Sequence, residues 1–189
     1  MRVQKIINSN FKFYLLTTKF VVFMSMQVLA QSYYSEVGTA SFTSSIPYYE
    51  FTGSSNQLTG LIDVSKNTVD FYLDLETLDS GIRKRDKDMR LILETKKYPF
   101  AEFYGILLDS IDLKSTQVQN IRTKGNFSIH GVSQEIEVKG NLTMIDNALK
   151  LTAEWIVKLD DYDILPPSFL IIKVDPIQKI YINVLLIQQ

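Results

Sequence analysis

The chain of 189 residues contains no cysteine and only one histidine, His130. Without cysteine it cannot form a disulfide, a thiolate metal site or a lipid-modified thiol. A single histidine supplies neither a histidine-based triad nor a multi-histidine metal site. His130 precedes Gly131 in a predicted turn, where we expect it to hydrogen-bond locally or face water. Glycine-rich phosphate loops, nucleophile elbows and zinc-ligand spacings are also missing, so the sequence predicts no catalytic residue, cofactor or metal.

Acidic residues are absent from the first 30 positions. Four basic residues lie there: Arg2, Lys5, Lys12 and Lys19. The apolar stretch FVVFMSMQVLA follows them, and Val28 and Ala30 are small residues at its end. This order of charge, apolar core and small residues predicts a signal peptide over residues 1–30 with cleavage near Ala30. The product is then expected to be secreted or periplasmic.

Lysines at positions 12 and 19 interrupt the apolar residues of this segment, which leaves too short an uncharged run to span a bilayer. We therefore expect no stable membrane span after cleavage. Residues 31–189 are predicted to form one domain with 16 basic and 21 acidic residues. A domain of negative net charge has no electrostatic footprint for nucleic acid, so we expect no nucleic-acid partner.

The dominant hydrophobic period after residue 30 is two, which is typical of strands with one buried and one exposed face. TVDFYLDLE shows it clearly, and QEIEVKGNLTM and KLTAEWIVKL repeat it. KIYINVLLI alternates less cleanly, so we expect that strand to be covered on both sides. The turn sequences VSKN, HGVS and DNA separate apolar runs. Short strands with tight connections favour an all-β antiparallel sheet that closes on itself, because closure removes exposed edges.

One charged stretch, RKRDKDMRLILETKKYPFAEF at residues 83–103, departs from this period. Its apolar residues fall at helical spacing, and Asp86 or Asp88 can cap the start of a helix. Pro99 ends the helical pattern. The sequence predicts a short amphipathic helix near residues 86–97, whose narrow apolar stripe can be buried over one mouth of a barrel.

The segment TVDFYLDLETLDSGIRKRDKDMRLILETKKYPFAEFYG, followed by TKGNFSIHGVSQEIEVKGNLTM, resembles the YceI family. The shared features are an alternating strand, an Arg-Asp pair, a short helix, Lys-Tyr-Pro before an aromatic strand, and Gly-Val before the next strand. The resemblance spans roughly residues 34–189 and is strongest between 69 and 144. Two departures, the lack of a histidine-serine pair in SEVGTASFTSS and of an arginine-containing segment in DDYDILPPSFLIIKV, suggest a divergent member.

The resemblance implies a lipocalin-like barrel of about eight strands, with the charged helix as a plug or lid on an apolar interior. Some family members hold a polyisoprenoid or another long lipid chain, so it implies a non-enzymatic lipid-binding barrel. An eight-stranded barrel is only wide enough for packed side chains or one slender ligand. The candidate ligand-binding residues of the interior are Val69, Phe71, Leu73, Met89, Leu93, Phe103, Phe127, Ile129, Ala153, Trp155 and Ile182.

Two other hypotheses remain open. In the first, the barrel is solidly packed and its outer tyrosines bind a protein partner. The tyrosines considered for this role are Tyr33, Tyr34, Tyr48 and Tyr49. In the second, paired carboxylates such as Asp70, Asp74 and Glu76 catalyse hydrolysis. Acids at alternate strand positions are, however, also what a solvated outer face requires.

The signal-peptide prediction is tested at the amino terminus of exported protein. N-terminal sequencing is expected to begin at Gln31 or within a few residues of it, because cleavage follows the small residues of the apolar segment. A product that retains MRVQKIINSN and sediments with membranes would contradict the prediction.

Overall fold

The structure, a computed structural model, describes residues 31–46, 49–165 and 174–189. The predicted signal peptide over residues 1–30 and Tyr48 lie outside the described residues. The strands are β1 (Ser32–Ile46), β2 (Tyr49–Asp63), β3 (Thr68–Asp74), β4 (Phe100–Leu107), β5 (Gln119–Ile129), β6 (Val132–Ile145), β7 (Ala148–Lys158) and β8 (Ile177–Gln188). The helices are the 3-10 turn η1 (Leu75–Thr77), the α-helix α2 (Arg83–Ile92) and the 3-10 turn η2 (Leu159–Tyr162).

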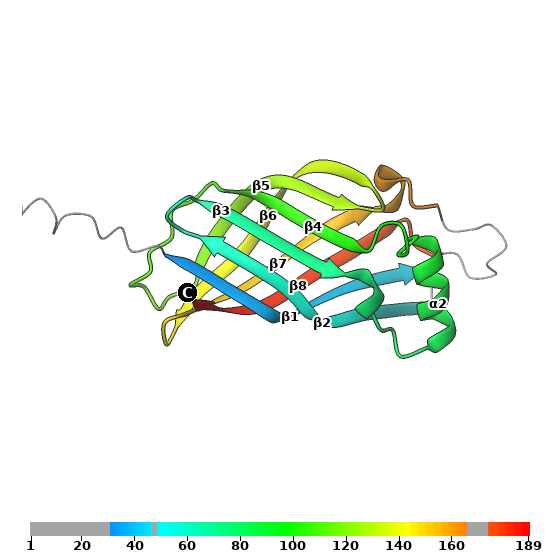
Figure 1. The fold of residues 1–189 in the computed structure, drawn as a ribbon, viewed down its shortest axis with the longest axis horizontal. Helices are drawn as coiled ribbons and strands as arrows, with labels where there is room; N and C mark the ends of the chain where they lie inside the picture. The colour runs from blue at the N-terminus through cyan, green and yellow to red at the C-terminus, as the bar shows by residue number, and fades with distance from the viewer. Residues whose placement is uncertain (1–30, 47–48, 166–173) are drawn as a thin grey trace, which may run out of the picture. The chain divides into compact units, whose positions relative to one another are not determined.

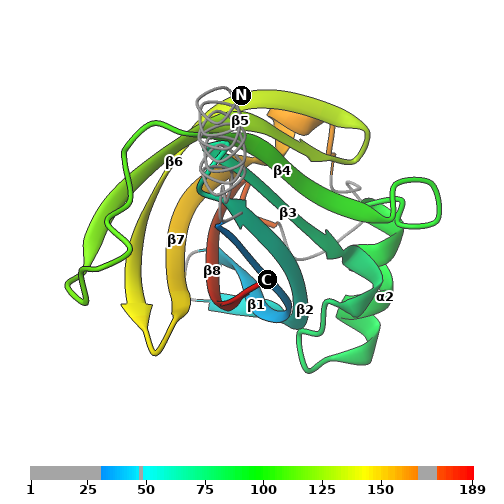
Figure 2. The ribbon, with the colours of Figure 1, turned by 60° about the vertical axis from the view of Figure 1, so that its left-hand side comes forward.

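All eight strands form one closed antiparallel barrel (Figure 1). Each strand pairs with the next along the chain, and β8 pairs with β1 to close the sheet. The predicted all-β antiparallel barrel with a single short α-helix among the described residues is therefore confirmed. Figure 2 shows α2 outside the strands, at one end of the barrel.

Tight turns join the central strands where the sequence predicts them. His130 and Gly131, between β5 and β6, have φ of 56° and 78°. Asp146 and Asn147, between β6 and β7, have φ of 46° and 66°. Positive φ at both central residues defines the type I′ turn, whose twist matches that of the flanking strands. Each turn thereby fixes the register of its hairpin.

The pairing register between β1 and β8 shifts by one residue partway along the two strands. Tyr34 lies opposite Ile187, whereas Thr39 lies opposite Asn183, so one residue is bulged between the two segments. Gly38 lies in this bulge, and a β-carbon there would approach Val184 Cγ2 to 2.8 Å. Glycine therefore lets β1 and β8 pack closely at the seam of the barrel.

Close-packed side chains fill the barrel at the end away from α2. Leu142, Leu149 and Leu186 have no exposed surface there. Tyr33 is only 3% exposed and belongs to the same cluster, so its prediction as an outer tyrosine is wrong. Successive residues of a strand point to opposite faces, so Tyr33 faces inward and its neighbour Tyr34 faces outward.

Strand β8 has one buried and one exposed face. Its inward residues, such as Ile182 and Leu186, are buried. Its outward residues Tyr181, Leu185 and Ile187 are exposed, and no part of the chain that the structure describes covers them. The expectation that β8 is covered on both sides is therefore wrong. Outward apolar residues on a strand raise its mean hydropathy without implying a second packed layer.

Helix α2 begins earlier and ends earlier than the predicted helix over residues 86–97. Ile82 is its N-cap and makes no side-chain cap hydrogen bond. Asp86 lies in the first turn and instead accepts hydrogen bonds from the Ser80 amide at 2.9 Å and the Ser80 hydroxyl at 2.6 Å. The helix stops at Ile92 because Glu94 adopts a left-handed conformation with φ of 47°. Local spacing could not reveal the tertiary partner of Asp86.

Replacement of Asp86 by alanine is expected to lower the free energy of unfolding by about 2 kcal/mol at neutral pH, because the partly buried amide and hydroxyl of Ser80 lose a charged acceptor. The hydroxyl and amide of Ser80 lower the pKa of Asp86. A lowered folded-state pKa contributes stability above the unfolded value that is lost as pH falls, so the difference should shrink below about pH 4. Urea denaturation at neutral pH and below pH 4 measures the loss of stability and its dependence on pH.

Asp88→Ala is the matched control, because Asp88 makes only an exposed ion pair with Lys84 at 2.7 Å. It should change stability by about 0.5 kcal/mol or less. Equal effects of the two substitutions would contradict the anchoring role of Asp86.

Candidate functional site

A row of small side chains crosses the barrel interior at mid-height. Gly140 on β6 lies opposite Ala153 on β7. Ala153 lies opposite Ile182 on β8, which in turn lies opposite Ala40 on β1. Three of these four residues carry at most one side-chain carbon. Because neighbouring strands place them at one level, they leave space that larger residues would fill.

The adjacent inward row, toward the packed end, carries bulky residues. Leu142 lies opposite Leu151, and Leu151 lies opposite Val184. All three side chains are buried, and Leu151 lines the open volume above them. The interior is therefore packed among these leucines and hollow toward α2.

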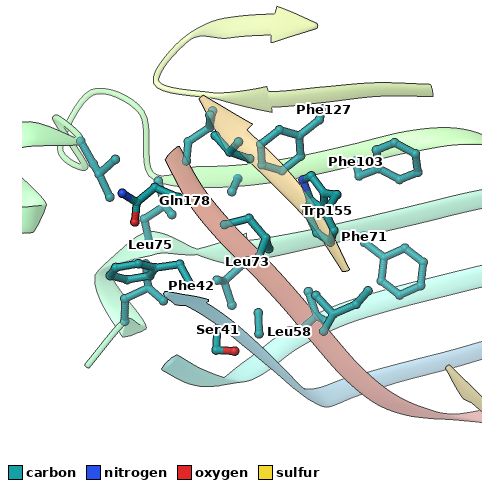
Figure 3. A pocket seen from close by; sticks show the side chains of 18 of the residues that line it. Ser41, Phe42, Leu58, Phe71, Leu73, Leu75, Phe103, Phe127, Trp155 and Gln178 are labelled. Carbon is teal, nitrogen blue, oxygen red and sulfur yellow. The ribbon is translucent and has the colours of Figure 1, made fainter. Parts of the chain in front are cut away.

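The hollow region is a cavity of about 740 Å³, within the range of small-molecule sites (Figure 3). It opens at the end of the barrel that carries α2. The exposed residues of its wall include Tyr49 at the start of β2, Ile82 before α2, and Lys84 on α2. Most of the wall is apolar or aromatic. Such a cavity favours an apolar ligand, because displacing water from its wall is favourable without any directional contact.

All eleven residues predicted to contact a ligand lie in the wall of this one cavity. They are Val69, Phe71, Leu73, Met89, Leu93, Phe103, Phe127, Ile129, Ala153, Trp155 and Ile182. Figure 3 shows Phe71, Leu73, Phe103, Phe127 and Trp155 gathered around the space. The structure thus brings together residues from five strands and α2, and their contact with a ligand stays a prediction.

Aromatic rings are fixed in the cavity wall by edge-to-face contacts and by one glycine. Phe127 contacts Trp155 and Tyr162, with ring centroids 5.7 and 5.6 Å apart. Phe71 lies across Gly60 of the neighbouring strand, where a β-carbon would clash with its ring. Glycine at this position lets the ring of Phe71 lie against the sheet. The rings therefore shape a wall with few alternative conformations.

Polar atoms in the interior are few. The amide nitrogen of Gln178 donates to the Ser44 hydroxyl at 3.1 Å and to the Asp175 carbonyl at 2.5 Å. The indole nitrogen of Trp155 is buried and has no hydrogen-bond partner among the described residues. A ligand with an acceptor atom near this nitrogen would satisfy it, whereas a pure hydrocarbon would leave it unpaired.

Sequence reasoning missed wall residues from β1, β2 and the start of β8. Phe42 and Leu58 line the cavity but lie in serine- and threonine-rich strands whose alternation is weak. Gln178 carries a detectable signal, because it is in phase with the inward residues Ile180 and Ile182. A polar residue at an inward strand position indicates a buried hydrogen bond or a ligand contact.

Helix α2 completes the wall at the mouth, as the predicted plug or lid requires. Met89 and Ile92 face the cavity. Arg85 donates to the Tyr49 hydroxyl at 2.6 Å, and its guanidinium lies 4.4 Å from the centroid of the Phe51 ring. The mouth is thus polar and charged, whereas the interior is apolar.

The acidic residues considered for hydrolysis have structural partners or face outward. Asp74 caps η1 through the Glu76 amide at 2.9 Å, and Glu76 accepts a hydrogen bond from the Thr95 hydroxyl. That hydrogen bond, with help from nearby Lys96, lowers the pKa of Glu76. Asp70 is exposed on the outer face of β3. Within residues 31–46, 49–165 and 174–189, no cluster of three metal-ligating side chains occurs.

His130 is largely buried beside the β5–β6 turn. Its Nδ1 lies 3.1 Å from the carbonyl oxygen of Tyr162, and its ring packs edge-on against Tyr98. The expectation that His130 bonds locally or faces water is therefore wrong, because its partner is distant in the sequence. The contact joins the β5–β6 hairpin to η2.

The fold and the cavity define a class of small closed antiparallel barrels with an internal cavity. The YceI-like domain matches residues 33–184, and the chain belongs to this family. Curated proteins give no match. Among the helices of the described residues, none has the length and apolar character needed to cross a membrane.

Solved structures confirm the fold at low sequence identity. A polyisoprenoid-binding domain from Saccharophagus degradans, implicated in plant cell wall breakdown, is 16% identical with a TM-score of 0.72, covering 85% of this chain and 99% of that domain. BcnA from Burkholderia cenocepacia is 13% identical with a TM-score of 0.67, and the match covers 79% of this chain and 95% of BcnA. A YceI protein from Campylobacter jejuni is 15% identical with a TM-score of 0.55, and the match covers 72% of this chain and 84% of that protein.

The contrast between packed and hollow regions predicts that the same change, leucine to alanine, has unequal effects on stability at two positions. Leu149→Ala, in the packed region, is expected to lower the free energy of unfolding by about 2–5 kcal/mol, because it removes apolar contacts and leaves a void. Leu73→Ala should cost distinctly less, because its side chain already borders open space and no new void forms around it. Urea denaturation compares them, and equal costs would show that both regions are packed.

Proposed function

We propose that this protein binds a single long-chain apolar lipid, of the isoprenoid type or similar, inside its barrel without catalysing a reaction. The cavity of about 740 Å³ that opens beside α2 carries the proposal. Membership in the YceI-like family and the similar polyisoprenoid-binding domain support it. We further propose that the protein acts after export, outside the cytoplasm, where a carrier would shield such a chain from water.

The energetics favour a long chain over a small apolar molecule. Each methylene removed from water contributes about 0.8 kcal/mol, whereas association opposes binding by roughly 4–15 kcal/mol. A chain of roughly nineteen buried methylene-sized groups is therefore needed to offset the larger of these estimates. A ligand of that length fits an elongated interior that is closed at one end by the packed leucines.

The interaction-module hypothesis is less well supported by these observations. It requires a solid barrel, whereas the interior holds a cavity of about 740 Å³. Of its four tyrosines, Tyr33 is buried and Tyr48 lies outside the described residues. Tyr49 is exposed but hydrogen-bonds to Arg85 at the cavity mouth. The hydrolase hypothesis is weakened because Asp74 and Glu76 serve the η1 and α2 contacts.

Native mass spectrometry of the gently purified protein is expected to show extra mass that organic extraction removes. Ala153→Trp should keep the fold but lose this mass, because the indole would occupy the space above the row of small residues. Ile156→Trp is the matched control on the same strand, where the side chain is 52% exposed on the outer face. That variant should retain both fold and cargo.

Two outcomes would contradict the proposal. One is a parent protein without removable mass after expression in its own host. The other is an Ala153→Trp variant that is destabilised by roughly 1–3 kcal/mol, as expected of overpacking in a solid core. Thermal unfolding of the three proteins separates loss of cargo from loss of fold.

A further inference from the structure

Positive charge in the predicted domain is concentrated in one short segment. Residues 83–97 hold seven basic and three acidic residues. The rest of residues 31–189 holds nine basic and eighteen acidic residues. The domain is therefore strongly acidic except around α2, which contributes to the wall at the mouth of the cavity. Such asymmetry orients a protein toward a negatively charged surface.

Three of the five basic residues of α2 lie together on one exposed face. Arg83, Lys87 and Leu91 are spaced four residues apart and therefore lie along one line of the helix. Lys84 lies beside this line, and all four residues are exposed. Leu91 is 67% exposed although it is a large apolar residue. We refer to these four residues as the basic face.

The basic face is largely free to bind an external partner. Arg83 and Lys87 make no ion pair with any residue that the structure describes, whereas Lys84 pairs with Asp88. The opposite side of α2 is already engaged: Asp86 binds Ser80, and Met89 and Ile92 line the cavity. Lys84 belongs to the basic face and also to the cavity wall, so the two surfaces meet at the mouth.

From this arrangement we infer that the basic face docks the barrel onto an anionic lipid membrane. Two uncompensated cations attract the lipid headgroups, and Leu91 inserts between them. This inference rests on the proposed function, because docking brings the mouth of the cavity to the source or destination of its lipid. A lipid surface is favoured over a purely polar acidic partner because an exposed leucine lies at the end of this line of cations.

Vesicle sedimentation tests the docking directly, with the full chain expressed with its natural N-terminus. The protein should bind vesicles of equal parts phosphatidylcholine and phosphatidylglycerol and not vesicles of phosphatidylcholine alone. Neutralising Arg83 and Lys87 together (Arg83→Gln with Lys87→Gln) should weaken binding about 30-fold, and Leu91→Ser about tenfold. Raised salt should weaken binding by the parent, since the contributing charges are exposed.

The matched control is Lys139→Gln with Lys150→Gln, which changes the net charge equally on exposed residues of β6 and β7. This control should bind within about threefold of the parent, since these charges are not on α2. Equal weakening by both double variants would overturn the inference, because net charge alone would then explain binding. Equal binding to neutral vesicles would also overturn it.

These measurements distinguish a failure of the proposed lipid binding from a failure of the proposed membrane docking. A protein that carries removable lipid but does not bind anionic vesicles would overturn the docking inference and leave an acidic protein as the partner of the basic face. A protein that binds anionic vesicles through Arg83 and Lys87 but never carries lipid would overturn the proposed function and leave docking intact. Native mass spectrometry of the same samples reports the cargo.

Discussion

Pairing between β1 and β8 closes the sheet, and the cavity depends on that closure. A closed sheet leaves no edge strand, so every inward residue faces other inward residues across the barrel. The seam is the most irregular part of the sheet, because β1 shifts register between Tyr34 and Thr39. Gly38 permits the close contact with Val184 that this irregularity demands. Without closure, the apolar wall of the cavity would be an exposed surface.

Side-chain size then decides which part of the interior is hollow. Backbone geometry is similar along the barrel, but Ala40, Ala153 and Gly140 occupy one level where the adjacent row has Leu142 and Leu151. A row of small residues reduces the side-chain volume in the interior, and so leaves space, without removing any backbone hydrogen bond of the sheet. The packed region can therefore supply stability from buried leucines while the open region stays free for a ligand.

The residues predicted from the sequence all lie in the cavity wall, although they are a minority of it, because strand alternation is a local signal. Phe71, Phe127 and Trp155 face inward for the same reason that their neighbours face water. The start and end of α2 were not predictable in this way, because Asp86 is held by Ser80 rather than by a helix amide. Tyr33 was misassigned because a tyrosine suits either face of a strand, and its burial depends on the distant leucines around it.

Polar contacts fix α2 unequally on its two sides. Asp86 binds Ser80, and Arg90 and Thr95 bind Glu76, so one side of the helix segment is joined to residues 76–80 by several hydrogen bonds. Toward β2 the helix makes the Arg85 contact with Tyr49 and the Phe51 ring. Separation of α2 from β2 breaks fewer polar contacts than separation from η1, so the β2 side is the energetically easier path to the cavity.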